Sequence, residues 1–187
     1  MTEAHILGVL QSKLDAKRYA HSLAVAAEAG RLAAKYGADP AKARIAGLLH
    51  DVMKNQTAEY QLQLCAEFGI ILDNIEKVTE KLLHAKSGAA YIEHRLGVTD
   101  PDLLNAVRYH TTARAGMSPL EKTLYLADFT SADRDYDDVG EMRRLVDIGM
   151  KEAMRYALIY TIKDLIGHNN PIHPDTVNAY NQLTMDG

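Results

Sequence analysis

The chain has 187 residues, a length typical of one domain whose core is large enough to enclose a polar site. Its apolar fraction of 47% and formal charge of -4 argue against a disordered tail and against electrostatic binding of nucleic acid. The single cysteine, Cys65, excludes an intramolecular disulfide and a multi-thiolate zinc site, and no apolar run reaches the roughly 20 residues needed to cross a bilayer. We therefore expect a cytoplasmic protein with no membrane segment and no nucleic-acid partner.

The first part of the chain has helical periodicity, in which apolar residues recur every three or four positions. Asp39 followed by Pro40 is typical of a helix cap with proline at the first helical position. Gly37 and Gly69 are each typical of the residue that follows the end of a helix. The predicted helices cover 2–14, 16–36, 40–54 and 57–68, and 70–76 is predicted to be a connection.

The second part is also helical and contains no alternating strand pattern, internal repeat or low-complexity linker. Ser118 and Glu121 flank Pro119 as in a capping box, which predicts a helix running to Asp128. Further helical segments are predicted over 78–83 up to His84, over 87–96, from 101 to just before His110, over 139–165 as two helices or one broken helix, and over 174–183. We predict an all-α helical bundle with a single domain over 1–187, a metal-site core at about 16–130 and C-terminal helices at about 139–184.

The stretch from Gly47 to Lys54 contains the first chemical signal, because an apolar run ends in the adjacent residues His50 and Asp51. Neighbouring helix residues point about 100° apart, so these two side chains can reach one buried cluster from two directions. Asp51 can span two metal ions through its two oxygens, and Lys54, one turn after His50, adds positive charge. The alternative for the pair alone is the polar end of an ordinary helix.

Six residues of metal-ligand type stand at ends or turns of separate predicted helices: His21, His50, Asp51, His84, His110 and Asp128. Imidazole and carboxylate without thiolate suit iron, manganese, zinc or nickel better than calcium. A helical bundle can point such side chains inward. Six ligands are enough for two ions bridged by Asp51, and a water between the ions would become a nucleophile near neutral pH. In this hypothesis His21, His50 and Asp128 hold one ion, while His84 and His110 hold the other. A structural role is the alternative for each histidine alone.

Five short motifs follow one another along the chain: Arg18-Tyr19-Ala20-His21-Ser22, Leu48-Leu49-His50-Asp51 with Lys54, Leu83-His84 with Gly88-Ala89, Tyr109-His110-Thr111-Thr112, and Leu126-Ala127-Asp128. The series resembles the HD-domain phosphohydrolases, and most closely the YqeK family of symmetrical diadenosine tetraphosphate hydrolases. The resemblance implies an HD-domain helical bundle with a two-metal centre that splits this dinucleotide into two ADP. It also implies two divalent transition-metal ions, with iron favoured over manganese, nickel, zinc or cobalt.

The sequence departs from the family pattern at two places. Ala113 stands where the family usually has glycine, and residues 129–133 replace a Glu-Pro type segment before Arg134. The six ligands are unaffected, so these departures concern the shape of the substrate groove and the role of Arg134. The other histidines match no ligand position and are assigned surface or structural roles: His5, His94, His168 and His173.

A phosphate substrate requires positive charge and hydrogen-bond donors beside the nucleophile. Lys54 and Arg134 can supply the charge, and Thr111 and Thr112 can donate hydrogen bonds to phosphate oxygens. We therefore predict that Asp51, Lys54 and Arg134 are catalytic. Ordinary surface use of the cations, and a helix stop at the two threonines, are the alternatives.

Three functions remain open from the sequence. The leading hypothesis is symmetrical hydrolysis of diadenosine tetraphosphate or a close dinucleoside polyphosphate. A di-iron oxygenase on the same fold and a nucleotide-sensing module without turnover are the alternatives, and Lys54 and Arg134 favour a polyanionic ligand. The oligomeric state is also open, and a homodimer is compatible with the sequence.

Overall fold

The computed structural model describes residues 2–186, so Met1 and Gly187 of the predicted domain lie outside the described residues. This part of the chain consists of α-helices and contains no strand, which confirms the predicted all-helical fold. No helix within it is long and apolar enough to cross a membrane. The helices are α1 (Glu3–Lys13), α2 (Ala16–Tyr36), α3 (Pro40–Leu49), α4 (Ala58–Glu67), α5 (Asn74–Val78), α6 (Glu80–Leu96), α7 (Pro101–Tyr109), α8 (Pro119–Thr130), α9 (Val139–Ile148), α10 (Met150–Gly167) and α11 (Pro174–Met185).

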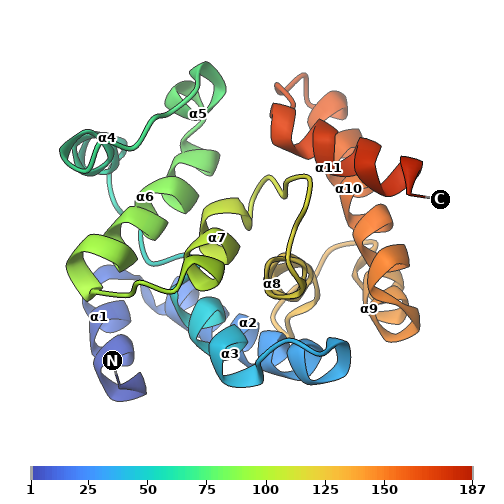
Figure 1. Cartoon of the computed structure of the whole chain (residues 1–187), viewed down its shortest axis with the longest axis horizontal. Helices are drawn as coiled ribbons and strands as arrows, with labels where there is room; N and C mark the ends of the chain where they lie inside the picture. The colour runs from blue at the N-terminus through green and yellow to red at the C-terminus, as the bar shows by residue number, and fades with distance from the viewer. Residues whose placement is uncertain (1, 187) are drawn as a thin grey trace.

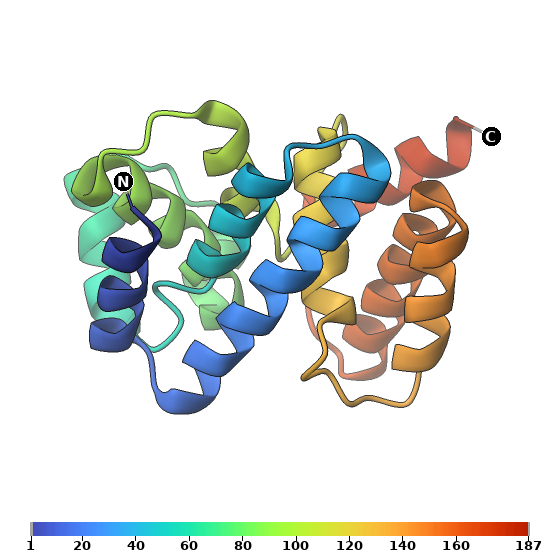
Figure 2. The same cartoon turned by 90° about the horizontal axis from the view of Figure 1, so that it is seen from below.

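Helices α2, α3 and α8 form the centre of the fold (Figures 1 and 2). Helices α6 and α7 pack on one side of this centre, while α9, α10 and α11 form a group on the other side. Leu32, Leu48 and Leu124 are fully buried where the central helices meet. Burial of each such side chain stabilises the fold by roughly 1.5–3 kcal/mol.

The close packing of α2 on α3 depends on Gly47. A Cβ atom at this position would lie 2.6 Å from the Cα of Ala26 and 2.9 Å from its backbone nitrogen. These distances are too short for carbon atoms in contact, so only glycine allows the two backbones to approach this closely. The consequence is that His21 on α2 comes next to His50 at the end of α3, with ring centroids 5.4 Å apart.

The helix predicted over 40–54 ends earlier, at Leu49. His50 is the C-cap, and the amide of Val52 donates to the carbonyl of Leu49 at 3.0 Å, while the amide of Lys54 donates to the carbonyl of Asp51 at 2.8 Å. These bonds span three residues, as in tight turns, instead of the four residues of an α-helix. The predicted length was therefore wrong, and both His50 and Asp51 lie on turns that follow the helix.

The region around His84 also differs from the prediction. Helix α6 runs without a break from Glu80 to Leu96, so His84 lies inside a helix and not at the end of a separate segment. The predicted connection over 70–76 contains the start of α5, which is capped by Asp73 and Glu76 in a reciprocal capping box. That box was present in the sequence as an aspartate followed three residues later by a glutamate, which is a helix start signal.

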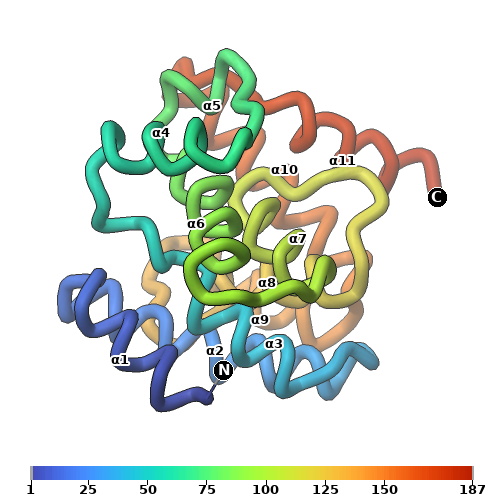
Figure 3. The backbone as a smooth tube through the Cα atoms, turned by 60° about the vertical axis from the view of Figure 1, so that its left-hand side comes forward, coloured from blue at the N-terminus to red at the C-terminus, as the bar shows by residue number. Residues whose placement is uncertain are grey.

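The segment predicted over 139–165 as two helices or one broken helix forms two helices, α9 and α10. Gly149 has an extended backbone and separates α9 from α10. Helix α11 packs against α10, and its first residues lie close to α5 (Figure 3). The start of α11 therefore connects the C-terminal helices to the part of the chain that contains α4 to α6.

Candidate metal centre

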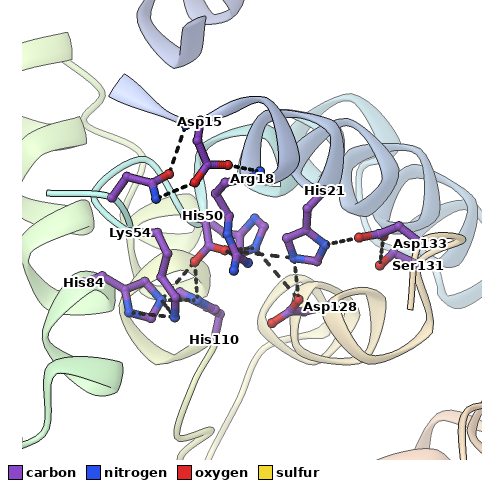
Figure 4. Close-up of polar contacts among 12 residues, drawn as sticks. Asp15, Arg18, His21, His50, Lys54, His84, His110, Asp128, Ser131 and Asp133 are labelled. Atoms are coloured by element: carbon purple, nitrogen blue, oxygen red, sulfur yellow. Dashed lines mark hydrogen bonds and ion pairs between the residues drawn. The ribbon is translucent and has the colours of Figure 1, made fainter. Parts of the chain in front are cut away.

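The six predicted ligands converge in one cluster. Five of them are labelled in Figure 4 and point toward one another: His21, His50, His84, His110 and Asp128. The six ligands come from α2 (His21), the turn after α3 (His50 and Asp51), α6 (His84), the C-cap of α7 (His110) and α8 (Asp128). The four imidazoles and the Asp51 carboxylate are buried, while the Asp128 side chain is 20% exposed. The cluster therefore has one side that opens toward solvent.

The two oxygens of Asp51 face two different groups of imidazoles. Its Oδ1 lies 3.0 Å from Nε2 of His84 and 3.7 Å from Nε2 of His110. Its Oδ2 lies 3.4 Å from Nε2 of His50 and 4.0 Å from Nε2 of His21. Oδ1 of Asp128 lies 3.0 Å from Nε2 of His21 and closes the second group. This is the arrangement expected of a carboxylate placed between two cations.

His50 and His110 are oriented by the same kind of hydrogen bond to the backbone of the preceding helix. Each follows the last residue of its helix, and its Nδ1 lies 2.7 Å from the carbonyl oxygen three residues earlier, that of Gly47 or Val107. Because Nδ1 donates its hydrogen to this carbonyl, the lone pair of Nε2 faces the cluster. Nε2 of His50 is buried and has no hydrogen-bond partner, which a bound cation would satisfy.

His21 is oriented by Asp133, a residue to which the sequence assigned no role. Nδ1 of His21 lies 2.7 Å from Oδ2 of Asp133, whose other oxygen accepts a hydrogen bond from the Ser131 hydroxyl at 2.8 Å. A carboxylate behind a metal-binding imidazole fixes its orientation and raises its basicity. The only signal for Asp133 in the sequence was its position shortly after α8, two residues after Ser131, in the segment that departs from the family pattern.

The charges of the cluster are those of a cation site. Burial lowers the pKa of His84 to about 4, so this imidazole is neutral at pH 7 and keeps its lone pair. Burial opposes ionisation of Asp51, but His50 and His110 hold the pKa of its carboxyl well below the usual range. Burial opposes the charged form of His50, but Asp51 and Asp128 raise its pKa, so a metal ion at its Nε2 would displace a proton. A neutral imidazole beside ionised carboxylates is the state that binds metal. The donor set is therefore that of a centre for divalent metal ions.

Three cationic side chains surround these ligands. Nζ of Lys54 lies 3.4 Å from both ring nitrogens of His84, and burial lowers the pKa of this lysine. Arg134 binds the carboxylate of Asp128, and its Nε donates to the Asp128 carbonyl at 2.6 Å. Arg18, which the sequence showed only as part of a motif, lies 2.7 Å from Oδ2 of Asp51. Two guanidinium groups therefore lie at the open side of the cluster, each paired with a carboxylate of the centre.

The turn after His110 contains the two predicted threonines. Thr111 is half-buried, and Thr112 is buried with its hydroxyl donating to the carbonyl of Ala113 at 2.9 Å. That hydroxyl can reach a phosphate only if it gives up this bond. Ala113 has a φ of 57°, in the left-handed region that glycine adopts without strain, which explains why glycine is suited to this position.

Two cavities open beside the cluster and share Arg134 and Tyr136. The first has a volume of about 390 Å³ and is lined mainly by charged residues, while the second has about 230 Å³ and is largely aromatic. Lining the first are Lys17, Arg18, His21, Asp133, Arg134, Asp135 and Tyr136, and lining the second are Asp128, Phe129, Arg134, Tyr136 and Tyr160. One surface beside the cluster is therefore charged and the other aromatic.

Known proteins share this fold and much of this sequence. The HD domain family matches residues 18–133. The chain is 36% identical to a protein named "Bis(5'-nucleosyl)-tetraphosphatase, symmetrical" from Halalkalibacterium halodurans, over 100% of this chain and 99% of the relative. It is 35% identical to a protein of the same name from Bacillus subtilis, over 98% of each chain. A crystal structure described as a predicted HD superfamily hydrolase involved in NAD metabolism, from Clostridium acetobutylicum, has a TM-score of 0.96 at 36% identity and covers 100% of this chain and 99% of its own. The chain therefore belongs to the HD domain family, in the group whose full-length relatives are symmetrical bis(5'-nucleosyl)-tetraphosphatases.

Proposed function

We propose that the protein is a metal-dependent phosphohydrolase that cleaves diadenosine tetraphosphate at its central anhydride and releases two ADP. The observation that carries this proposal is the Asp51 carboxylate, whose oxygens face two groups of imidazoles beside the guanidinium groups of Arg18 and Arg134. The full-length relatives named as symmetrical tetraphosphatases support the choice of substrate.

The proposed cofactor is a pair of divalent transition-metal ions, one held by His21, His50 and Asp128 and the other by His84 and His110, with Asp51 between them. Iron suits this imidazole and carboxylate set, and manganese, nickel, zinc and cobalt are the alternatives. When bound, such ions polarise a phosphoryl oxygen and supply a nucleophile from water near neutral pH. The fit is supported by the buried Nε2 of His50, which has no hydrogen-bond partner.

The residues of the chain itself bind and align the polyphosphate. An in-line displacement at phosphorus develops negative charge on the phosphoryl oxygens, which nearby cations stabilise. Lys54 lies on the side of His84, while Arg18 and Arg134 lie on the side of His21. These charges on both sides of Asp51 suit a chain of phosphates that crosses the cluster.

The aromatic cavity is our proposed site for one adenine. The rings of Tyr136 and Tyr160 have centroids 5.4 Å apart, and both line the cavity next to Arg134. Aromatic faces stack with any base, so this contact gives affinity with little base selectivity. The bond that is cleaved then depends on how many phosphates separate this adenosine from the cluster, because the nucleophile is fixed in space.

Hydrolysis of diadenosine tetraphosphate by metal-loaded protein in water labelled with heavy oxygen tests the proposal. We expect ADP as the only nucleotide product, with one labelled ADP for each cleavage. Release of ATP and AMP would contradict symmetrical cleavage but not hydrolysis. No release from fully loaded protein would reject hydrolysis and favour the sensing or oxygenase alternatives, which nucleotide binding and oxygen consumption would separate.

Metal analysis tests the bridging position independently of activity. We expect about two ions per chain in the wild type and loss of both in Asp51→Ala, because each proposed site uses one oxygen of this carboxylate. Asp147→Ala is a matched control, since this aspartate is 61% exposed on α9 and pairs only with exposed cations. Full metal occupancy in Asp51→Ala would contradict the bridge.

A further inference from the structure

A second group of metal-type ligands lies where α5 meets the start of α11. Asp73, Glu76 and His173 each offer a ligand atom, and these atoms lie within 4.8 Å of one another. Glu76 and His173 are only 3% and 5% exposed, respectively, so this is not an ordinary surface cluster of acidic residues. None of the three belongs to the centre around Asp51.

The capping box of α5 aims one oxygen of each carboxylate at His173. The amide of Glu76 donates to Oδ1 of Asp73 at 2.8 Å, and the amide of Asp73 donates to Oε2 of Glu76 at 2.9 Å. The remaining oxygens, Oδ2 of Asp73 and Oε1 of Glu76, lie 2.7 Å and 3.6 Å from Nε2 of His173. Three ligand atoms on two distant segments therefore face one point.

His173 Nε2 is buried and makes no hydrogen bond. Although Oδ2 of Asp73 is close to it, the contact lacks the geometry of a hydrogen bond, which requires the acceptor to lie near the N–H axis. Nε2 of His50, in the centre around Asp51, is in the same condition. A buried imidazole nitrogen that faces two carboxylate oxygens without a well-aligned hydrogen bond is placed as a metal ligand would be.

The surrounding charges favour a divalent cation. Two carboxylates face the point, and the nearest cation of the chain, Nζ of Lys86, binds Oε1 of Glu76 at 3.1 Å. A third carboxylate, that of Asp175, lies 3.7 Å from Nδ1 of His173. One imidazole with two carboxylates is a ligand set used for zinc and for other first-row divalent metals.

Binding at Nε2 has a defined proton balance. Nδ1 of His173 accepts the amide hydrogen of Asp175 at 3.1 Å, so the neutral ring carries its own hydrogen on Nε2. A neutral ring binds a cation through Nε2 only when its hydrogen moves to Nδ1, where it gives up the amide of Asp175 and faces the Asp175 carboxylate instead. A carboxylate behind the imidazole is a common feature of zinc sites.

We propose that Asp73, Glu76 and His173 form a second, zinc-type cation site that joins α5 to the start of α11. A hydrogen bond connects this part of the chain to the turn beside the centre around Asp51. The Thr176 hydroxyl, in the first turn of α11, donates to the carbonyl of Thr112 at 2.8 Å. Thr112 is two residues after the ligand His110. A cation at the second site therefore holds α11 against the turn that follows His110.

Anomalous diffraction at the zinc absorption edge, from crystals of the full chain grown with zinc, tests this site directly. We expect a peak between His173 Nε2, Oδ2 of Asp73 and Oε1 of Glu76, with Lys86 displaced from Oε1, in addition to any peaks around Asp51. His173→Gln should lose this peak alone. The control is His168→Gln, because the His168 side chain is 69% exposed and only contacts Asp164 on its own helix. No peak at the second site while the Asp51 centre is occupied would overturn the proposal.

Glu76→Gln is a second variant, which we expect to fold like the wild type. The glutamine oxygen can still accept the amide of Asp73, so the cap of α5 is preserved while the charge facing His173 is removed. We expect this variant to have an unchanged helical circular dichroism spectrum and at least a tenfold weaker affinity for zinc at this site, so that at limiting zinc it holds one ion per chain fewer than the wild type. A folded Glu76→Gln protein with the zinc content and affinity of the wild type would show that these residues form only an ion pair.

Discussion

Replacing Gly47 with alanine tests whether the contact between α2 and α3 positions the metal centre. A Cβ atom at 2.6 Å from the Cα of Ala26 must move to about 3.4 Å, so the two helices must separate by roughly 0.8 Å. The colliding atoms belong to backbone and cannot rotate away. Alanine favours the helix by about 1 kcal/mol, while overpacking of this kind costs about 1–3 kcal/mol.

We expect a net loss of about 1 kcal/mol in the free energy of unfolding, or about 3 °C in Tm for a chain of this size. The loss of activity should be larger than the loss of stability. Gly47 also accepts the Nδ1 hydrogen of His50, so a shift of α3 against α2 moves His50 relative to His21. Since a misplacement of about 1 Å can cost about 100-fold in rate, we expect kcat/KM for diadenosine tetraphosphate to fall by about 10- to 100-fold.

Gly88→Ala is the matched control on a neighbouring helix of the same centre. Its Cβ would lie 3.7 Å from Cγ1 of Val107 and 3.8 Å from the carbonyl oxygen of His50, which are ordinary contacts. Denaturant titration and steady-state kinetics at saturating metal should show this variant to be as stable as the wild type, or up to about 1 kcal/mol more stable, with unchanged kcat/KM. If Gly47→Ala behaves in the same way, the close approach does not position the histidines.

Three further predictions concern side chains around the centre. Asp133→Ala should weaken metal binding by about 10- to 100-fold in chelator competition, because His21 loses its orienting carboxylate, and equal loss in the exposed control Asp137→Ala would contradict this role. Lys54→Met should keep its metals but lower kcat/KM, whereas Lys77→Met should not; unchanged kinetics for Lys54→Met would remove its phosphate role. Burial raises the pKa of the Cys65 thiol to about 11, so at pH 8 iodoacetamide should label unfolded protein much faster than native protein, and equal rates would show that the thiol is accessible.

The starts of the helices were predictable because capping signals act over three or four residues. Asp39 with Pro40 and Ser118 with Glu121 begin α3 and α8 where the sequence predicts. The end of α3 was not predictable, because the residues after Leu49 continue a helical pattern. The tight turns there place His50 and Asp51 in a buried site, and that burial comes from packing by other helices.

For the metal centre, the types of ligand and their order along the chain could be predicted from the sequence. Histidine, aspartate and flanking cations were visible as residues, but not which atom of each faces the cluster. The two oxygens of Asp51 point to different imidazoles only because α2, α6 and α7 approach from different sides. Asp133 was missed for the same reason, since nothing local shows that it lies behind His21.

The cluster of Asp73, Glu76 and His173 could not have been predicted from the sequence. In the sequence, Asp73 and Glu76 are a helix cap, and His173 is a histidine in a loop about 100 residues later. Local patterns report propensity over one or two turns, whereas the meeting of α5 with α11 depends on the packing of every helix between them. The three residue types can therefore be read from the sequence, but their ligand atoms come together only in the folded protein.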